Sequence, residues 1–273
     1  METVRIPGRP ALAVTHAGKG ELVLFLHGIG GNRSNWTRQL ERFSRDFHVA
    51  AWDMRGYGES EGYDGPFTFA DVRQDVDRVL DYFGAPASHL VGLSLGGRVA
   101  YGYAFHRPQR VLSLTACSAV PFAEDMTPET RRQFLERRMA PLLAGKSPAD
   151  IAPGVAQSLA GPGCTAVALQ ELTTSIAALH RDSYLKTLEG AATCAERFDL
   201  SGIRVPTHVV AAGHDTLFPP AKLKAVADAI REARYSVLEQ AGHLSNLECP
   251  GAFDEAVGAF LADLQRARGG APT

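Results

Sequence analysis

The sequence predicts an α/β fold, a mostly parallel, doubly wound sheet flanked by helices, with a helical cap inserted into it. Two observations support this. Short apolar runs alternate with helical patterns in both terminal parts of the chain, which is typical of a parallel sheet covered on both faces. Between about residues 120 and 203 no convincing strand pattern occurs. We therefore expect an α/β core from residues 1–120 and 204–273, and a cap from residues 121–203.

Seven short apolar runs are the predicted strands of this core. They are rich in β-branched or other apolar residues, and several end at a glycine or a polar turn. They cover residues 12–16, 22–26, 48–52, 90–93, 111–116, 208–212 and 236–238.

Helices are predicted between the strands and throughout the cap. In residues 68–83, Val72, Val76 and Val79 share one face, which predicts a helix packed beside the sheet and without a chemical role. In the cap, Thr127-Pro128 begins one helix, residues 149–160 indicate another, and residues 165–188 indicate one or two more. An amphipathic helix is expected after Pro250.

Ser94 is the predicted nucleophile. It lies between Gly92 and Gly96, after an apolar run and before a helical pattern. A serine at a sharp strand-to-helix turn exposes its hydroxyl, and glycine on either side avoids a backbone collision. A glycine-flanked serine in an ordinary turn is the alternative.

A serine hydroxyl needs a base, and the base needs an acid to orient it. His243 and Asp215 follow Ser94 in that order, and each comes just after a predicted strand. Asp215 could instead cap the helix near Pro220. The other acids that could orient the base are Asp199, Glu124 and Asp125, and His243 could be a structural histidine.

Four motifs in this order resemble those of the α/β-hydrolase family, over nearly the whole chain. They are His27-Gly28-Ile29-Gly30, the stretch from Asp53 to Ser60, the Ser94 turn, and Gly242-His243 with Glu248 and Pro250. The resemblance implies a serine hydrolase with a Ser94, Asp215 and His243 triad. It also implies an oxyanion hole made by the backbone amides of Ile29 and Leu95. In the family, a histidine at the position of His27 holds the loop that carries the first of these amides.

Within the family, the segment 241–248 looks most like the 3-oxoadipate enol-lactonase branch, which opens an unsaturated lactone in aromatic catabolism. Because such a lactone carries a carboxylate, we expect a cation of the cap over the pocket. The candidates are Arg181, Lys186, His180 and Arg138, with surface arginines as the alternative. Trp36 could line the pocket or pack under a helix.

Other activities share these motifs. A carbon–carbon hydrolase of ring-cleavage products usually has tryptophan after its histidine, where this chain has Leu244. A general carboxylesterase, an amidase, a perhydrolase and a triad-bearing ligand-binding protein stay open. The expected chemistry needs no metal, nucleotide or redox cofactor, and the chain has neither a His-Glu-x-x-His motif nor a Rossmann glycine fingerprint.

Composition favours a small-molecule substrate. The formal net charge is −2 in 273 residues, with no dense Lys/Arg stripe, so neither nucleic acid nor an anionic membrane is an expected partner. The four cysteines lack metal-site spacing, and no signal peptide or membrane span is recognisable. We expect a cytoplasmic enzyme whose oligomeric state, a homo-oligomer included, is left open.

Overall fold

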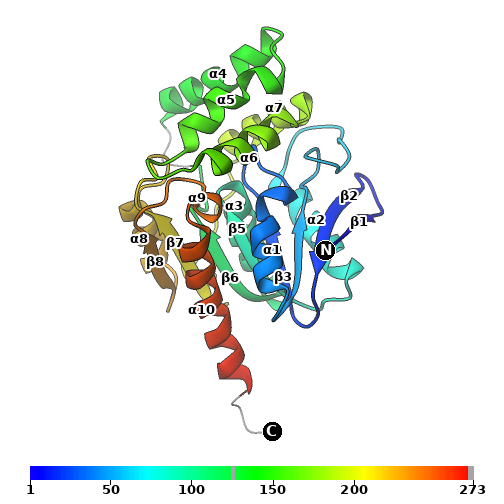
Figure 1. Cartoon of the computed structure of the whole chain (residues 1–273), viewed down its shortest axis with the longest axis vertical. Helices are drawn as coiled ribbons and strands as arrows, with labels where there is room; N and C mark the ends of the chain where they lie inside the picture. The colour runs from blue at the N-terminus through cyan, green and yellow to red at the C-terminus, as the bar shows by residue number, and fades with distance from the viewer. Residues whose placement is uncertain (124–126, 270–273) are drawn as a thin grey trace.

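The computed structural model describes residues 1–123 and 127–269. Its centre is an eight-stranded sheet with the order β1-β2-β4-β3-β5-β6-β7-β8 (Figure 1). Strands β1 and β2 run antiparallel to their neighbours, and all remaining pairs are parallel. The strands are β1 (Glu2–Ile6), β2 (Leu12–Ala17), β3 (Leu22–Leu26), β4 (His48–Trp52), β5 (Ser88–Leu93), β6 (Val111–Cys117), β7 (Thr207–Ala212) and β8 (Arg234–Leu238).

All seven predicted strands are present, with ends shifted by a few residues. The eighth, β1, was not predicted. It is an edge strand, most of its side chains are exposed, and within the described residues it pairs with β2 alone, where Val4 lies opposite Val14. An exposed edge strand lacks the apolar run by which a strand is recognised in sequence.

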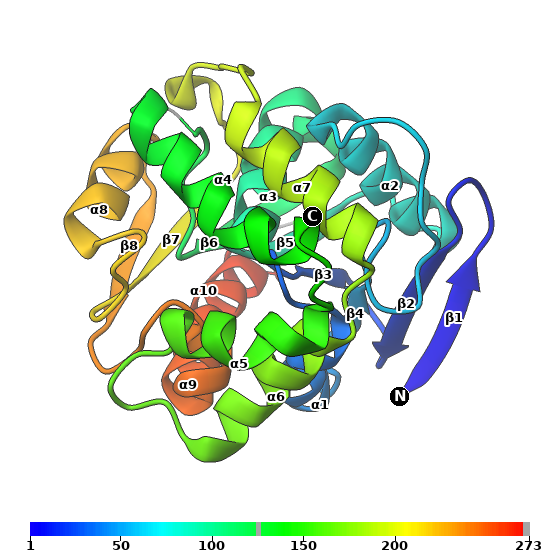
Figure 2. The same ribbon diagram turned by 90° about the horizontal axis from the view of Figure 1, so that it is seen from above.

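Helices cover both faces of the sheet, as Figure 2 shows from above. On one side lie α1 (Thr37–Phe43) and α10 (Pro250–Gly269), which contact each other, and on the other lie α2 (Phe69–Tyr82) and α3 (Leu95–His106) with α8 (Pro220–Asp228). Helix α2 is the helix predicted over residues 68–83, and it buries Val72, Val76 and Val79 as expected. The core of the protein therefore lies between the sheet and these two layers.

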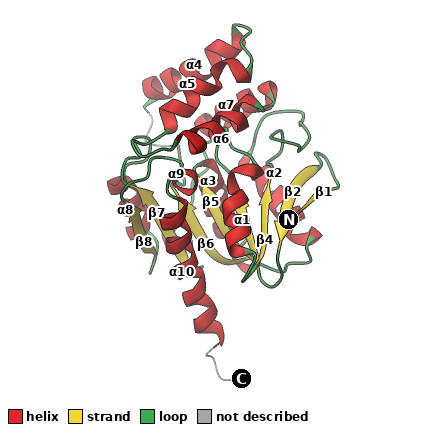
Figure 3. Ribbon diagram, in the orientation of Figure 1, coloured by secondary structure: helices red, strands yellow, loops and turns green. Residues whose placement is uncertain are grey.

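The described residues between β6 and β7 form a short 3-10 helix, Leu200–Gly202, and four α-helices, which we call the cap. They are α4 (Pro128–Leu143), α5 (Pro148–Leu159), α6 (Ala166–Ala177) and α7 (Arg181–Thr193). Helix α5 packs on α6, and α4 packs on α7. The cap lies above the edge of the sheet from which the loops after the parallel strands emerge (Figure 3).

The cap makes polar contacts with several of these loops. Ser175 Oγ of α6 donates to the carbonyl of Gly30, 2.9 Å away, in the loop after β3. The backbone amide of Gly161 donates to Glu248 Oε2 at 2.8 Å, near the loop after β8. Because the cap is bound to the loops themselves, it encloses whatever those loops carry.

No helix in the described part of the chain is both long and apolar enough to cross a membrane. Within residues 1–123 and 127–269, no group of three or more His, Cys, Asp or Glu side chains is arranged to hold a metal ion.

Candidate active site

Ser94 occupies the turn between β5 and α3 with an unusual backbone conformation. Its φ is 55° and its ψ is −117°, although it carries a side chain. Non-glycine residues at positive φ are strained, and such strain persists only where the surroundings impose it. The strained turn places Ser94 at the N-terminus of α3, directly after the last residue of β5.

Close backbone packing explains why glycine is required around this turn. A Cβ on Gly96 would collide with the carbonyl oxygen of Leu26 in β3, and a Cβ on Gly28 would lie 2.9 Å from Ser94 Cβ. Both glycines therefore allow the β3 loop and the start of α3 to approach each other across Ser94. Alanine at either position would have to push apart the backbone that surrounds the hydroxyl.

Asp215 and His243 lie together at the same edge of the sheet. Asp215 follows β7, His243 follows β8, and His243 Nδ1 lies 2.9 Å from Asp215 Oδ2. Both side chains are buried. Since Nδ1 faces the carboxylate, the other ring nitrogen, Nε2, is the one available to a reacting group.

The environment of Asp215 keeps its carboxyl group ionised. Burial alone would raise its pKa, but the hydrogen bond and charge of His243 and two backbone amides outweigh this and lower the pKa. The amides are those of Leu217 and Phe218, which donate to Oδ1 at 2.9 and 3.0 Å. The second carboxylate oxygen is thereby left to orient His243.

His27 fixes the loop that follows β3. Its Nε2 accepts a hydrogen bond from the Met54 amide at 3.0 Å, so the proton is on Nδ1, which donates to Gly28 O at 2.8 Å. Burial lowers the pKa of His27, which keeps the ring neutral in this arrangement. Because Gly28 C=O and Ile29 N–H belong to one peptide plane, this bond orients the Ile29 amide.

A chamber of about 350 Å³ opens between the cap and the edge of the sheet that carries Ser94 and His243. Ser94, His243, Ile29 and Leu95 line its floor, and most of its other walls are apolar. Among the described residues that line it, none is acidic, and three besides His243 are basic: Arg98, Arg138 and Lys222. The chamber suits a small, largely apolar molecule, and a negative charge on it would find cations in the wall.

The predicted cap cations do not all reach this chamber. Arg138 of α4 lines it, with one nitrogen 3.2 Å from Ser158 Oγ. Arg181 donates instead to the carbonyl of Leu142 and pairs with Asp182, and Lys186 donates to the carbonyl of Tyr63 at 2.7 Å. Neither lines the chamber, because the packing of α7 turns both side chains toward other parts of the chain. His180, at the start of α7, does not line it either.

Trp36 is buried and packs against two aromatic rings, with its own ring centre 5.0 Å from that of Phe25 and 5.9 Å from that of Phe253. It does not line the chamber. It lines a separate recess of about 20 Å³ that also touches Ser94 and His243. The packing alternative therefore describes Trp36, and it does not line the chamber as a substrate-binding residue would.

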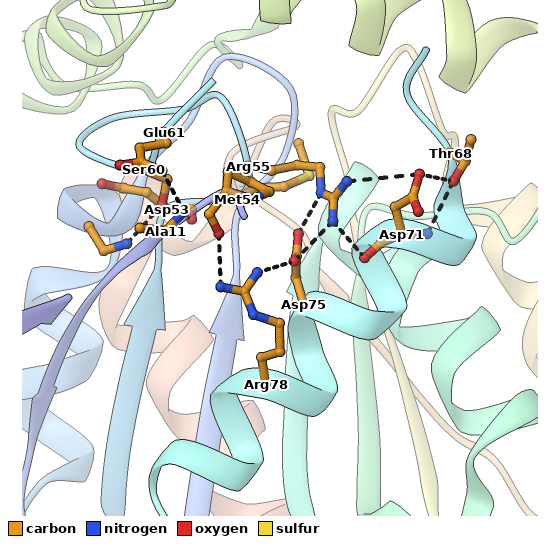
Figure 4. A network of polar contacts seen from close by, with 12 residues as sticks. Ala11, Asp53, Met54, Arg55, Ser60, Glu61, Thr68, Asp71, Asp75 and Arg78 are labelled. Carbon is orange, nitrogen blue, oxygen red and sulfur yellow. Dashed lines mark hydrogen bonds and ion pairs between the residues drawn. The ribbon is translucent and has the colours of Figure 1, made fainter. Parts of the chain in front are cut away.

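The conspicuous stretch from Asp53 to Ser60 forms a structural network. Figure 4 shows Arg55 bound to Asp75 of α2, with Nε and Nη2 at 2.6 and 3.0 Å from the carboxylate oxygens. Arg78 binds the same carboxylate at 2.8 Å. Arg55 does not line the chamber. Its fixed ion pairs connect the loop after β4 to α2.

Of the alternative acids, Asp199 caps the short helix Leu200–Gly202 through the Ser201 amide and does not reach His243. Glu124 and Asp125 lie outside the described residues.

Two further residues, Glu248 and Arg98, contact both the core and the cap, and the sequence did not predict these contacts. Glu248 binds the amides of Gly242 and Leu244 on either side of His243 and also that of Gly161 in the cap.

The second such residue is Arg98, four residues after Ser94 on α3. It donates to the carbonyls of Pro121 and Ala191, before the first and near the end of the last cap helix. Its spacing from Ser94 was visible in the sequence. Its partners are backbone carbonyls, however, which have no sequence signal.

Comparison with known proteins agrees with the fold. Residues 21–250 match the family model for the alpha/beta hydrolase fold. The chain is 28% identical to 3-oxoadipate enol-lactonase 2 of Acinetobacter baylyi, over 88% of each protein. It is 27% identical to a putative carbamate hydrolase of Azorhizobium caulinodans, over 91% of this chain and 94% of the other. A malate-bound esterase structure from Thermogutta terrifontis superposes with a TM-score of 0.88 at 26% identity, covering 97% and 99%.

Proposed function

Because the chain belongs to the α/β-hydrolase fold family, we propose that it is a serine hydrolase that cleaves a small ester or lactone through Ser94, His243 and Asp215. The observation that carries this proposal is the joint placement of a strained serine turn and a buried Asp–His pair at the floor of one chamber. A nucleophile, a base and an orienting acid are the groups that acyl transfer requires.

The reaction proceeds in two steps. Ser94 Oγ attacks the carbonyl carbon while His243 Nε2 takes the hydroxyl proton, and the same proton then goes to the departing oxygen as its bond to carbon breaks. Water next attacks the acyl-enzyme, gives its proton to His243 and releases the acid, and Ser94 recovers its proton. The amides of Ile29 and Leu95 stabilise the oxyanion in both steps.

The substrate we propose is a small lactone or ester that carries a carboxylate. The chamber volume of about 350 Å³ supports a small substrate, and Arg138 and Arg98 in its wall support an anionic one. Two relatives point the same way, since one is named an enol-lactonase and one is an esterase with malate bound. An enol-lactone of aromatic catabolism fits this description.

The decisive experiment measures hydrolysis by the wild type and by Ser94→Ala in parallel. The substrates are p-nitrophenyl acetate, an unsaturated γ-lactone with a carboxymethyl substituent, the methyl ester of that lactone, a carbamate and a ring-cleavage dienoate. We expect the anionic lactone to be preferred, and kcat/KM to fall at least ~10⁴-fold in Ser94→Ala. The control is the circular dichroism spectrum of the variant, which should match that of the wild type.

Full turnover by Ser94→Ala would overturn the serine mechanism. Turnover of the neutral esters alone would make the protein a general carboxylesterase, and cleavage of the dienoate would make it a carbon–carbon hydrolase. Stoichiometric binding without multiple turnover would assign it a ligand-binding role.

A further inference from the structure

The recess beside Ser94 and His243 differs from the chamber in size. It measures about 20 Å³, and Leu172 of α6 closes it on the cap side. A site for one water molecule needs roughly 10–15 Å³ of such space. The recess therefore has room for one water molecule, whereas an organic substituent of several atoms does not fit.

Two buried side chains of its lining carry a polar atom without a hydrogen-bond partner. Trp36 is 0% exposed and its Nε1–H has no acceptor; Asn246 is 1% exposed and its Oδ1 has no donor. The orientation of the Asn246 amide is fixed, because its Nδ2 donates to the carbonyl of Asn35 at 2.9 Å. Buried polar atoms are seldom left unpaired, since the lost hydrogen bond to water is not replaced.

Both side chains line the recess, so a donor and an acceptor without partners belong to residues around a space with room for one water molecule, which needs such partners. Such a water would accept a hydrogen bond from Trp36 and donate one to Asn246. Ser94 and His243 line the same recess, so the water would lie beside the two groups that react with it during hydrolysis.

We propose that the recess is a binding site for a single water molecule and that this water hydrolyses the acyl-enzyme. The inference rests on the proposed serine mechanism. The water oxygen bonds to the acyl carbon as one of its protons passes to His243 Nε2. The bond between the acyl carbon and Ser94 Oγ then breaks, and Ser94 Oγ takes that proton back from His243.

The proposed water site affects whether water or an alcohol takes the acyl group from Ser94. The recess and the chamber share Ser94, His243 and Ile29, and they are otherwise lined by different residues. Water is therefore held apart from the acyl chain in the chamber. Methanol, with two heavy atoms, has to reach the acyl-enzyme through the chamber.

The test measures how the acyl-enzyme partitions between water and methanol, as the ratio of methyl ester to acid formed from p-nitrophenyl acetate. Trp36→Phe keeps the buried ring and removes only the donor. We expect it to raise this ratio about tenfold, because it slows hydrolysis without slowing methanolysis. Leu172→Phe, which fills the recess from the cap, should change the ratio in the same direction, and it serves if Trp36→Phe does not fold.

The chain offers a matched control in its other tryptophan. Trp52 in β4 is also buried with an unpartnered Nε1, but it does not line the recess. Trp52→Phe should leave the ratio within twofold of the wild type. An unchanged ratio in Trp36→Phe and Leu172→Phe, or an equal rise in Trp52→Phe, would overturn the water site. If Ser94→Ala keeps full turnover, the serine mechanism itself fails. This differs from failure of the water site alone, in which Ser94→Ala is inactive and the ratio in Trp36→Phe and Leu172→Phe is unchanged.

Discussion

Two aspartates of this protein follow parallel strands in nearly the same way, yet each binds a different basic side chain. Asp53 comes after β4 and accepts the amides of Arg33 and Glu59, both at 2.8 Å. Asp215 comes after β7 and likewise accepts two backbone amides. The third partner differs: the guanidinium of Arg33 binds Asp53, and the imidazole of His243 binds Asp215.

A fixed, buried carboxylate is therefore not by itself evidence of a catalytic role, because the group that it binds decides what it can do. Arginine keeps its proton at any physiological pH, so the pair of Asp53 and Arg33 can only hold its loop. Histidine gains and loses a proton near neutral pH, and its second nitrogen can serve a reaction. His243 also lines the chamber, whereas Arg33 does not.

The largest expected effect comes from Asp215→Asn. An amide in place of the carboxylate would leave His243 in the wrong tautomer for a base, so we expect kcat to fall ~10⁴-fold with little change in KM. Steady-state kinetics on the substrate that the panel identifies, beside thermal unfolding, gives the measurement. Activity within tenfold of the wild type would show that another acid orients His243.

The matched change at the other aspartate is Asp53→Asn. Removing the Asp53 charge leaves Arg33 with the exposed Glu59 as its remaining ionic partner, and we expect a loss of about 3 kcal/mol in the free energy of unfolding, the lower end of the range for a broken buried ion pair. Activity per folded molecule should stay close to that of the wild type. Urea unfolding and kinetics on the same preparation separate the two effects; a selective loss of kcat would place Asp53 in the catalytic machinery.

His208 is a buried histidine that, unlike His243, does not line the chamber. Burial, with the charge of Arg234 as a smaller cause, lowers the pKa of His208 from 6.5 to about 4. Between these pH values the unfolded chain binds the proton more strongly, so stability falls as the pH falls from 6.5 toward 4, by about 3 kcal/mol for this residue.

The measurement is urea unfolding at pH 7 and pH 4.5 for the wild type and for His208→Gln. The variant should lose less stability between the two pH values than the wild type, because it has no buried imidazole to protonate. An identical loss in both proteins would mean that His208 does not contribute to acid unfolding.

Much of the fold could be predicted because its signals are local. An apolar run identifies each buried strand, and a strand followed by glycine-flanked Ser94 identifies the turn at the sheet edge. The unpredicted strand β1 has no such run, since most of its side chains are exposed.

The contacts of the cap depend on tertiary packing and were not accessible in the same way. Arg138, Arg181 and Lys186 are equivalent as sequence candidates, and only the pairing of α4 with α7 decides which of them faces the chamber. The unpartnered atoms of Trp36 and Asn246 likewise exist only in the folded chain. Sequence indicates which residues can do chemistry, whereas packing decides which of them meet.

The smallest expected effect is a change in kcat/KM that distinguishes two cations of the cap, Arg138 and Lys186. For the lactone that carries a carboxylate, Arg138→Gln should lower kcat/KM about ten- to a hundredfold, which corresponds to one charge-assisted hydrogen bond. Its methyl ester should be hydrolysed as by the wild type. Lys186→Gln should change kcat/KM for either substrate by no more than about twofold, because that ammonium is half-exposed and bound to Tyr63 outside the chamber. If Lys186→Gln impairs the anionic substrate as much as Arg138→Gln does, the charge preference arises from the overall field of the cap and not from a group in the chamber wall.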